Sequence, residues 1–130
     1  MTNNDRRPKS VYGVGDEPDA RFSLANERTA LAWMRTGLAL VAGGVALTTL
    51  AVVADLSVFV DIMAALVCLS GGLLAVSALV GWRRAERAMR LSLPLPAPKV
   101  LTGVGVGILV LALVFAGYAV FEGVSRAVNG

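Results

Sequence analysis

Two arginines near residue 30 have the type and spacing to bind an anion. Arg28 and Arg35 are seven residues apart, so in a helix they share one face within about 20°. The planar guanidinium group of arginine binds two oxygens of a phosphate or carboxylate at once. Asn26 and Glu27 directly precede the pair and could contact the same ligand. The pattern predicts an anion-binding or pore-lining face formed by Asn26, Glu27, Arg28 and Arg35.

A second interpretation of the two arginines requires no ligand. Arg35 lies one residue before an uncharged apolar run, and its long side chain could carry its charge back to a membrane surface. Arg28 would then lie in water. Trp33, about 160° from Arg35 around a helix, would lie among lipid headgroups, where tryptophan is favoured. Both interpretations agree with the sequence and both stay open.

The elements that position these residues are predicted to be membrane helices. The chain has 130 residues, of which 56% are hydrophobic and 16% charged, and its mean hydropathy is +0.71. A soluble domain of this size cannot bury so much apolar surface. Uncharged apolar runs cover residues 36–54, 62–82 and 100–121, each about the 20 residues needed to cross the hydrocarbon. We predict an all-α integral membrane protein with three transmembrane helices in a small antiparallel bundle.

The first helix is predicted to begin before the membrane does. Ser23 is a suitable N-cap residue, and Glu27 in the first turn complements the helix dipole. A helix from there to residue 54 is about 45 Å long, which exceeds the roughly 30 Å of hydrocarbon. The three helices are expected over residues 24–54, 60–90 and 98–123, within a transmembrane domain over 21–125. The polar, turn-rich residues 1–20 are expected to form a mobile arm.

The distribution of basic residues predicts the orientation. Eleven of the twelve lysines and arginines precede the first span or lie in the second connection, and only Arg126 lies on the other side. By the positive-inside rule, the N-terminus is cytoplasmic and the C-terminus outside. The same rule accounts for the net charge of +3 without a nucleic-acid partner. The eleven residues are Arg6, Arg7, Lys9, Arg21, Arg28, Arg35, Arg83, Arg84, Arg87, Arg90 and Lys99.

A basic cluster follows the second span. Arg83, Arg87 and Arg90 have helical 3–4 spacing, so one face could contact lipid phosphate, although topology alone also explains these charges. Glu86 and Arg90 form an i,i+4 pair of small expected value.

Small residues are candidates for close helix packing. Gly103 and Gly107 form a G-x-x-x-G pair in the third span, and Gly43, Gly44 and Gly71 lie in the other two. They could pack helices within one protomer or between the protomers of an oligomer.

Catalytic and metal chemistry find little support in the sequence. The chain has no histidine and one cysteine, Cys68, within an apolar span, so a zinc site or a histidine-activated nucleophile is excluded. Asp55 and Asp61 are expected to be solvated loop charges. We therefore expect neither enzymatic activity nor a cofactor.

The stretch over residues 21–47 resembles the YidH-like family of small bacterial inner-membrane proteins, a domain family of unknown function. The shared segments are RFSLANERT at 21–29, LAWMRTGLAL at 31–40 and AGGVAL at 42–47, and Ala30 stands where a larger residue is expected. The resemblance implies a bacterial cytoplasmic (inner) membrane protein. The family is similar in turn to the membrane part of the vacuolar transporter chaperone complex, in which basic residues line a path for polyphosphate.

Together these observations predict a non-enzymatic membrane protein that forms a homo-oligomer. The family resemblance implies that Arg28 and Arg35 line a cytoplasmic-side vestibule for anions or polyphosphate, with Glu27 nearby as a pairing residue. The chain has no polymerase domain, so it could not make polyphosphate itself. The alternative is a structural or accessory protein that interacts with lipids, including anionic lipid, or with another membrane complex.

Overall fold

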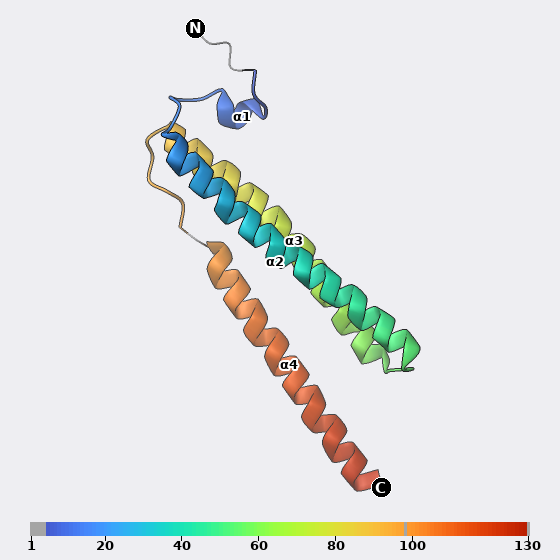
Figure 1. The fold of residues 1–130 in the computed structure, drawn as a ribbon. Helices are drawn as coiled ribbons and strands as arrows, with labels where there is room; N and C mark the ends of the chain where they lie inside the picture. Colours follow the sequence, from blue (N-terminus) through green and yellow to red (C-terminus); the bar gives the residue numbers. More distant parts are fainter. Residues whose placement is uncertain (1–4, 98, 130) are drawn as a thin grey trace. The chain divides into compact units, whose positions relative to one another are not determined.

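The computed structural model describes residues 5–97 and 99–129, and every regular element in this part of the chain is a helix (Figure 1). The predicted all-α class is therefore confirmed. Three helices are long and apolar enough to cross a membrane: α2 (Ala20–Val53), α3 (Val58–Arg90) and, over residues 100–128, α4 (Lys99–Asn129). The chain divides after residue 97 into two units. The helices are α1 (Lys9–Tyr12), α2 (Ala20–Val53), α3 (Val58–Arg90) and α4 (Lys99–Asn129).

Helices α2 and α3 pack against each other as an antiparallel hairpin along a seam of small residues. On α2 the buried positions recur every seven residues, and all four carry alanine or glycine. Buried residues of α3 have the matching 3–4 spacing. A seven-residue repeat keeps one face of a helix against its partner over several turns. The seam comprises Ala30, Gly37, Gly44 and Ala51 of α2 with Ala64, Val67, Gly71, Leu74 and Ala78 of α3.

The glycines of the seam bring the two backbones into direct contact. A Cβ atom on Gly37 would lie 2.7 Å from the carbonyl oxygen of Gly71, and one on Gly71 would lie 2.5 Å from that of Gly37. A Cβ atom on Gly44 would lie 2.8 Å from the carbonyl oxygen of Ala64. Lipid chains are as apolar as leucine, so close van der Waals contact of this kind, rather than burial from water, holds membrane helices together.

Of the glycines that the sequence selected, Gly44 and Gly71 lie in the seam, and Gly37 is an addition. A Cβ atom on Gly43 would meet nothing within 4 Å, so Gly43 does not pack against α3. The same holds for Gly103 and Gly107 within the unit that contains α4. For these two glycines, a role in packing stays a prediction.

Both long helices of the hairpin end in the same C-terminal motif. Asp55 has φ 47°, and the next amide, of Leu56, donates to the carbonyl of Ala51 at 2.9 Å. Ser92 has φ 53°, and the amide of Leu93 donates to the carbonyl of Ala88 at 2.9 Å. The left-handed residue turns the chain and satisfies a carbonyl that the helix leaves free. The first motif leads directly into α3.

The start of α2 differs from the prediction. The helix begins at Ala20, and Asp19, not Ser23, is its N-cap, since the Asp19 carboxylate accepts a hydrogen bond from the amide of Arg21 at 2.9 Å. Its 34 residues span about 51 Å. The surplus over the hydrocarbon lies at the N-terminal end of α2 and the C-terminal end of α3, beyond their apolar runs. These two ends lie side by side in the hairpin (Figure 1).

The segment before α2 is folded onto α3, where the sequence predicted a mobile arm over residues 1–20. Val11 is only 2% exposed, and the amide of Asp16 donates to the carbonyl of Arg90 at 3.1 Å. Gly15 has φ 61°, and a Cβ atom there would collide with the Arg90 carbonyl. These contacts join positions more than 70 residues apart, so no local pattern in the sequence indicates them, and the mobility of the segment stays a prediction. Residues 1–4 of the predicted arm lie outside the described residues.

Helix α4 forms the core of the second unit and extends further than the sequence indicated. It runs to Asn129, whereas the predicted end was residue 123, and an ion pair of 3.1 Å between Arg126 and Glu122 lies in its last turns. Residue 98, the predicted start of the third helix, lies outside the described residues. The place of this helix in the bundle stays a prediction.

Replacing Gly71 with alanine is expected to destabilise the hairpin by about 1–3 kcal/mol, because the added Cβ atom overpacks the seam. Gly72→Ala is the matched control, since a Cβ atom there meets nothing within 4 Å and alanine favours a helix by about 1 kcal/mol over glycine. Unfolding in mixed micelles of mild detergent and SDS measures both variants. Equal stability of the two would contradict the seam.

Candidate functional site

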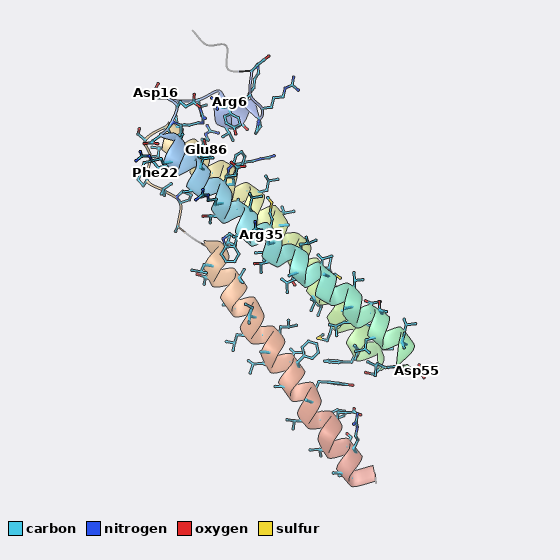
Figure 2. The ribbon with its side chains drawn as sticks, viewed as in Figure 1. Arg6, Asp16, Phe22, Arg35, Asp55 and Glu86 are labelled. Carbon is cyan, nitrogen blue, oxygen red and sulfur yellow. The ribbon has the colours of Figure 1, made fainter. Side chains whose placement is uncertain are left out.

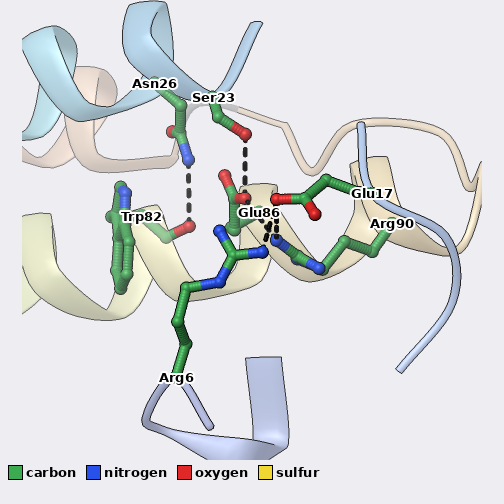
Figure 3. A network of polar contacts seen from close by, with 7 residues as sticks. All are labelled: Arg6, Glu17, Ser23, Asn26, Trp82, Glu86 and Arg90. Carbon is green, nitrogen blue, oxygen red and sulfur yellow. Dashed lines mark hydrogen bonds and ion pairs between the residues drawn. The ribbon is translucent and has the colours of Figure 1, made fainter. Parts of the chain in front are cut away.

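A cluster of polar side chains joins three segments of the chain at the surface end of the hairpin (Figure 3). We call it the helix-end cluster. Two of its members come from the start of α2, three from the end of α3 and two from the segment before α2. The members are Ser23, Asn26, Trp82, Glu86, Arg90, Arg6 and Glu17.

The centre of the helix-end cluster is a buried ion pair. The guanidinium of Arg90 lies 3.6 Å from the carboxylate of Glu86, and the two residues are only 5% and 3% exposed. The hydroxyl of Ser23 donates to the same Glu86 oxygen at 2.9 Å. The sequence predicted an i,i+4 pair of small value but not its burial, which depends on contacts with α2 and with the N-terminal segment. Removal of one partner from a buried pair leaves an uncompensated charge and is strongly destabilising.

Asn26 provides a second polar link between the helices. Its side-chain amide donates to the carbonyl oxygen of Trp82 at 3.2 Å. The sequence assigned Asn26 to an anion-binding face together with Arg28. In the structure Asn26 lies on the α3 side of α2 and stabilises the hairpin. Ser23 lies there too, because it is seven residues before Ala30 and therefore continues the seam.

The N-terminal segment contacts Arg90 from the other side. Glu17 accepts a hydrogen bond from Arg6, and the same Glu17 oxygen lies 3.9 Å from the guanidinium of Arg90. The ring of Tyr12 lies 4.8 Å from the Cζ atom of Arg90 and 5.2 Å from that of Arg6, both within cation–π distance. The ring of Trp82 is 6.5 Å from that of Tyr12. Two cations thus contact the carboxylate of Glu17, and the ring of Tyr12 contacts both cations.

The electrostatic effect of this arrangement falls on Glu17. The hydrogen bond from Arg6 and the charge of Arg6 lower the pKa of Glu17 from its ordinary value of 4.5, and the charge of Arg90 adds to the effect. Glu17 therefore stays ionised at neutral pH and can serve as an anion for the two guanidinium groups.

Two buried polar atoms of the cluster have no hydrogen-bond partner among the described residues. They are Oε2 of Glu86 and Nε of Arg90. Buried polar atoms are nearly always hydrogen-bonded in native proteins, so each exception requires a physical explanation.

The arginine face is separate from the helix-end cluster. Arg28 and Arg35 are exposed in the hairpin, and Arg28 is two residues before Ala30, which places it about 160° from the seam, nearly opposite to it. Because α2 begins at Ala20, Arg21 precedes Arg28 by another seven residues and extends the stripe. Figure 2 shows Arg35 part-way along α2, between the Glu86 end and the turn at Asp55. We define the arginine face as Arg21, Arg28 and Arg35.

No ion pair joins the arginine face to another residue in the part of the chain that the structure describes. Glu27, the predicted pairing residue, is exposed and makes no ion pair there either. The structure therefore agrees with the predicted shared face of Arg28 and Arg35 but separates Asn26 from it.

The predicted lipid-contact residues also divide. Arg83 and Arg87 are exposed on α3, and a contact with lipid phosphate stays a prediction for both. Arg90 is buried against Glu86 and Tyr12, so it does not share an exposed face with them. Within residues 5–97 and 99–129, no group of three or more cysteine, aspartate or glutamate residues could hold a metal ion.

Sequence reasoning missed most of the helix-end cluster. The seven-residue repeat of alanine and glycine could have been continued back to Ser23, which would have placed a hydroxyl opposite the end of α3. The contacts of Arg6, Tyr12 and Glu17 with Arg90 carry no local signal, because they depend on where the chain returns.

The comparisons with known proteins agree with this architecture. A family model described as "Domain of unknown function (DUF202)" matches residues 21–88, just over half of the chain. The chain is similar to the protein named "Inner membrane protein YidH" of Escherichia coli K12, with 42% identity over 81 residues that cover 62% of this chain and 70% of the relative. The protein of that name from Shigella flexneri matches equally well. No solved structure matches.

Glu86→Gln is expected to lower the free energy of unfolding by about 3 kcal/mol, because the buried Arg90 guanidinium loses the nearest opposite charge. The exposed Glu27→Gln variant removes the same charge from the same end of the hairpin and should change stability by less than about 0.5 kcal/mol. Unfolding in mixed micelles compares them. Similar losses in the two variants would show that the Glu86–Arg90 pair is not the centre of the cluster.

The pKa of Glu17 is expected to lie below 4.5 and to return towards 4.5 in Arg6→Gln. The Arg6–Glu17 contact therefore stabilises the fold fully above pH 4.5, and this contribution is lost as the pH falls through the lowered pKa. Carbon-13 NMR of the Glu17 carboxyl group measures the titration, with Arg7→Gln as the control of equal charge. A midpoint that Arg6→Gln leaves unchanged would contradict the contact.

Proposed function

Since the chain belongs to the DUF202 family of membrane proteins of unknown function, we propose that it is a non-enzymatic inner-membrane protein that binds anions. In this proposal several copies assemble, and the arginine face of each α2 contributes to a shared vestibule on the cytoplasmic side. The inner-membrane location draws on the name of the Escherichia coli relative. The single observation that supports the proposal best is the exposed, unpaired stripe of Arg21, Arg28 and Arg35.

The stripe runs along the axis of α2 towards the apolar run. Fourteen residues separate Arg21 from Arg35, so the stripe is about 21 Å long. It begins beside the helix-end cluster and reaches the residue before the apolar run. The charge of Arg35, directly next to the hydrocarbon, is costly unless it is paired or hydrated. Anions moving along such a stripe would meet successive guanidinium groups.

Assembly of several copies would let Arg35 face a hydrated axis and its anions instead of lipid. If the arginine faces of several protomers surround an axis, they form rings of guanidinium groups, which are a common basis of anion selectivity. Inorganic phosphate and its linear polymers fit because arginine binds phosphate oxygens in pairs. Glu27, directly before Arg28, would limit the net positive charge of each ring.

A structural or accessory role is the second candidate function. The observation in its favour is that Arg35 is exposed next to the apolar run, where its side chain can also reach the lipid headgroups. In that case the protein acts as a monomer that binds lipids or another membrane complex.

The arginine face is tested by anion flux into liposomes that contain the purified protein. Wild type should admit radiolabelled phosphate or short-chain polyphosphate, and Arg28→Ala/Arg35→Ala should reduce the flux at least tenfold, as expected when charge-assisted bonds to the anion are removed. Arg84→Ala, an exposed arginine of α3 outside the face, is the control. Native mass spectrometry reports the oligomeric state of each preparation.

Flux that is absent in wild type, or unchanged in the double variant, would overturn the vestibule. A monomer by native mass spectrometry would favour the accessory role instead.

A further inference from the structure

We propose that Arg6 and Arg90 form a second, phosphate-binding site at the membrane surface, which Glu17 of the same chain occupies as a substitute anion. The ligand is a phosphate group with free oxygens, carried by a lipid headgroup or present in solution. The site belongs to the helix-end cluster and not to the arginine face, so it goes beyond the proposed vestibule and does not depend on it.

Two positive charges converge on the carboxylate of Glu17. The guanidinium groups of Arg6 and Arg90 approach the same atom, Oε1 of Glu17, although they belong to segments more than 80 residues apart (Figure 3). A carboxylate presents only two oxygens to these two guanidinium groups. A phosphate group presents three or more oxygens and is the ligand that paired arginines match best.

The hydrogen bonding of the Arg90 guanidinium group is incomplete within the described residues. The Arg90 side chain is only 3% exposed, and its ion pairs with Glu86 and Glu17, at 3.6 and 3.9 Å, are both too long for hydrogen bonds. Its Nε atom has no partner within the described residues. A guanidinium group has five N–H donors, and buried donors are nearly always satisfied. A phosphate oxygen supplies the acceptors that Glu17 leaves out.

The two guanidinium groups are held in place without a phosphate ligand. Tyr12 contacts both guanidinium groups through its ring, at 4.8 and 5.2 Å, and the buried Val11 fixes the short helix that carries Tyr12. Glu86 orients Arg90 from the opposite side. Glu86 also offsets part of the Arg90 charge, so binding requires Arg6 as well.

The exposure of Glu17 and Arg6 gives a ligand access to the site. The side chains of Glu17 and Arg6 are 62% and 51% exposed, and ion pairs between exposed groups are weak. A phosphate with two negative charges can therefore compete with Glu17. Arg90 lies eight residues beyond the apolar run of α3, outside the hydrocarbon and on the side of the membrane surface.

The test compares Glu17→Gln with Asp16→Asn in the full chain, reconstituted in phosphatidylcholine nanodiscs. Both variants remove one negative charge, but only Glu17 contacts the two guanidinium groups. Isothermal titration calorimetry measures affinity for inorganic pyrophosphate, and native mass spectrometry measures retention of phosphatidic acid. Glu17→Gln should tighten binding about tenfold, as expected when a competing charge-assisted bond is removed, and Asp16→Asn less than twofold.

A second comparison identifies the residues that bind. Arg6→Gln added to Glu17→Gln should abolish the gain, whereas Arg7→Gln, the neighbouring exposed arginine, should preserve it. A gain with phosphatidic acid alone identifies a lipid headgroup, a gain with pyrophosphate alone identifies free phosphate, and either supports the site. The proposal is overturned if Glu17→Gln binds no tighter than Asp16→Asn, or if Arg7→Gln and Arg6→Gln reduce the gain equally.

Discussion

The close approach of the α2 and α3 backbones is the constraint on which the rest of the hairpin depends. Gly37 and Gly71 meet without side chains between them, and a Cβ atom on either would lie within 2.7 Å of the opposite carbonyl oxygen. Apolar side chains gain little from association in lipid, so this contact has to come from fit. The contact also fixes which side of each helix faces the other.

The two sides of α2 consequently have different surroundings, one packed against α3 and one exposed. The seam side continues through Ser23 and Asn26, which bond to Glu86 and to the carbonyl of Trp82. The far side carries the arginine face, about 160° away from Ala30. A single seven-residue repeat thus separates residues that stabilise the hairpin from residues available to a ligand. Polar residues only a few positions apart can therefore have unrelated roles.

The helix-end cluster extends the hairpin beyond the membrane and gives the N-terminal segment a place to bind. Arg90 is the common partner, since it contacts Glu86, Tyr12 and Glu17. A buried charge of this kind stabilises a fold only while its partners are present. Among the residues that the structure describes, Nε of Arg90 and the nearby Oε2 of Glu86 have no hydrogen-bond partner. Arg90 therefore supports the fold and also has an N–H donor without an acceptor among the described residues.

The sequence by itself determined the class of the protein, the number of apolar helices and the shared face of Arg28 and Arg35, because hydropathy and helical period are local properties of the chain. It also indicated Gly44 and Gly71 as packing residues. It did not determine that Gly37 joins the seam while Gly43 does not, since that depends on the rotation of α2 against α3.

Only the tertiary structure decided that Asn26 binds α3 and that Arg90 is buried against the N-terminal segment. Both depend on contacts between residues far apart in the chain. The N-terminal segment shows the reason most clearly: its polar, turn-rich residues look unstructured in isolation, but the buried Val11 and the carbonyl of Arg90 give them an ordered place.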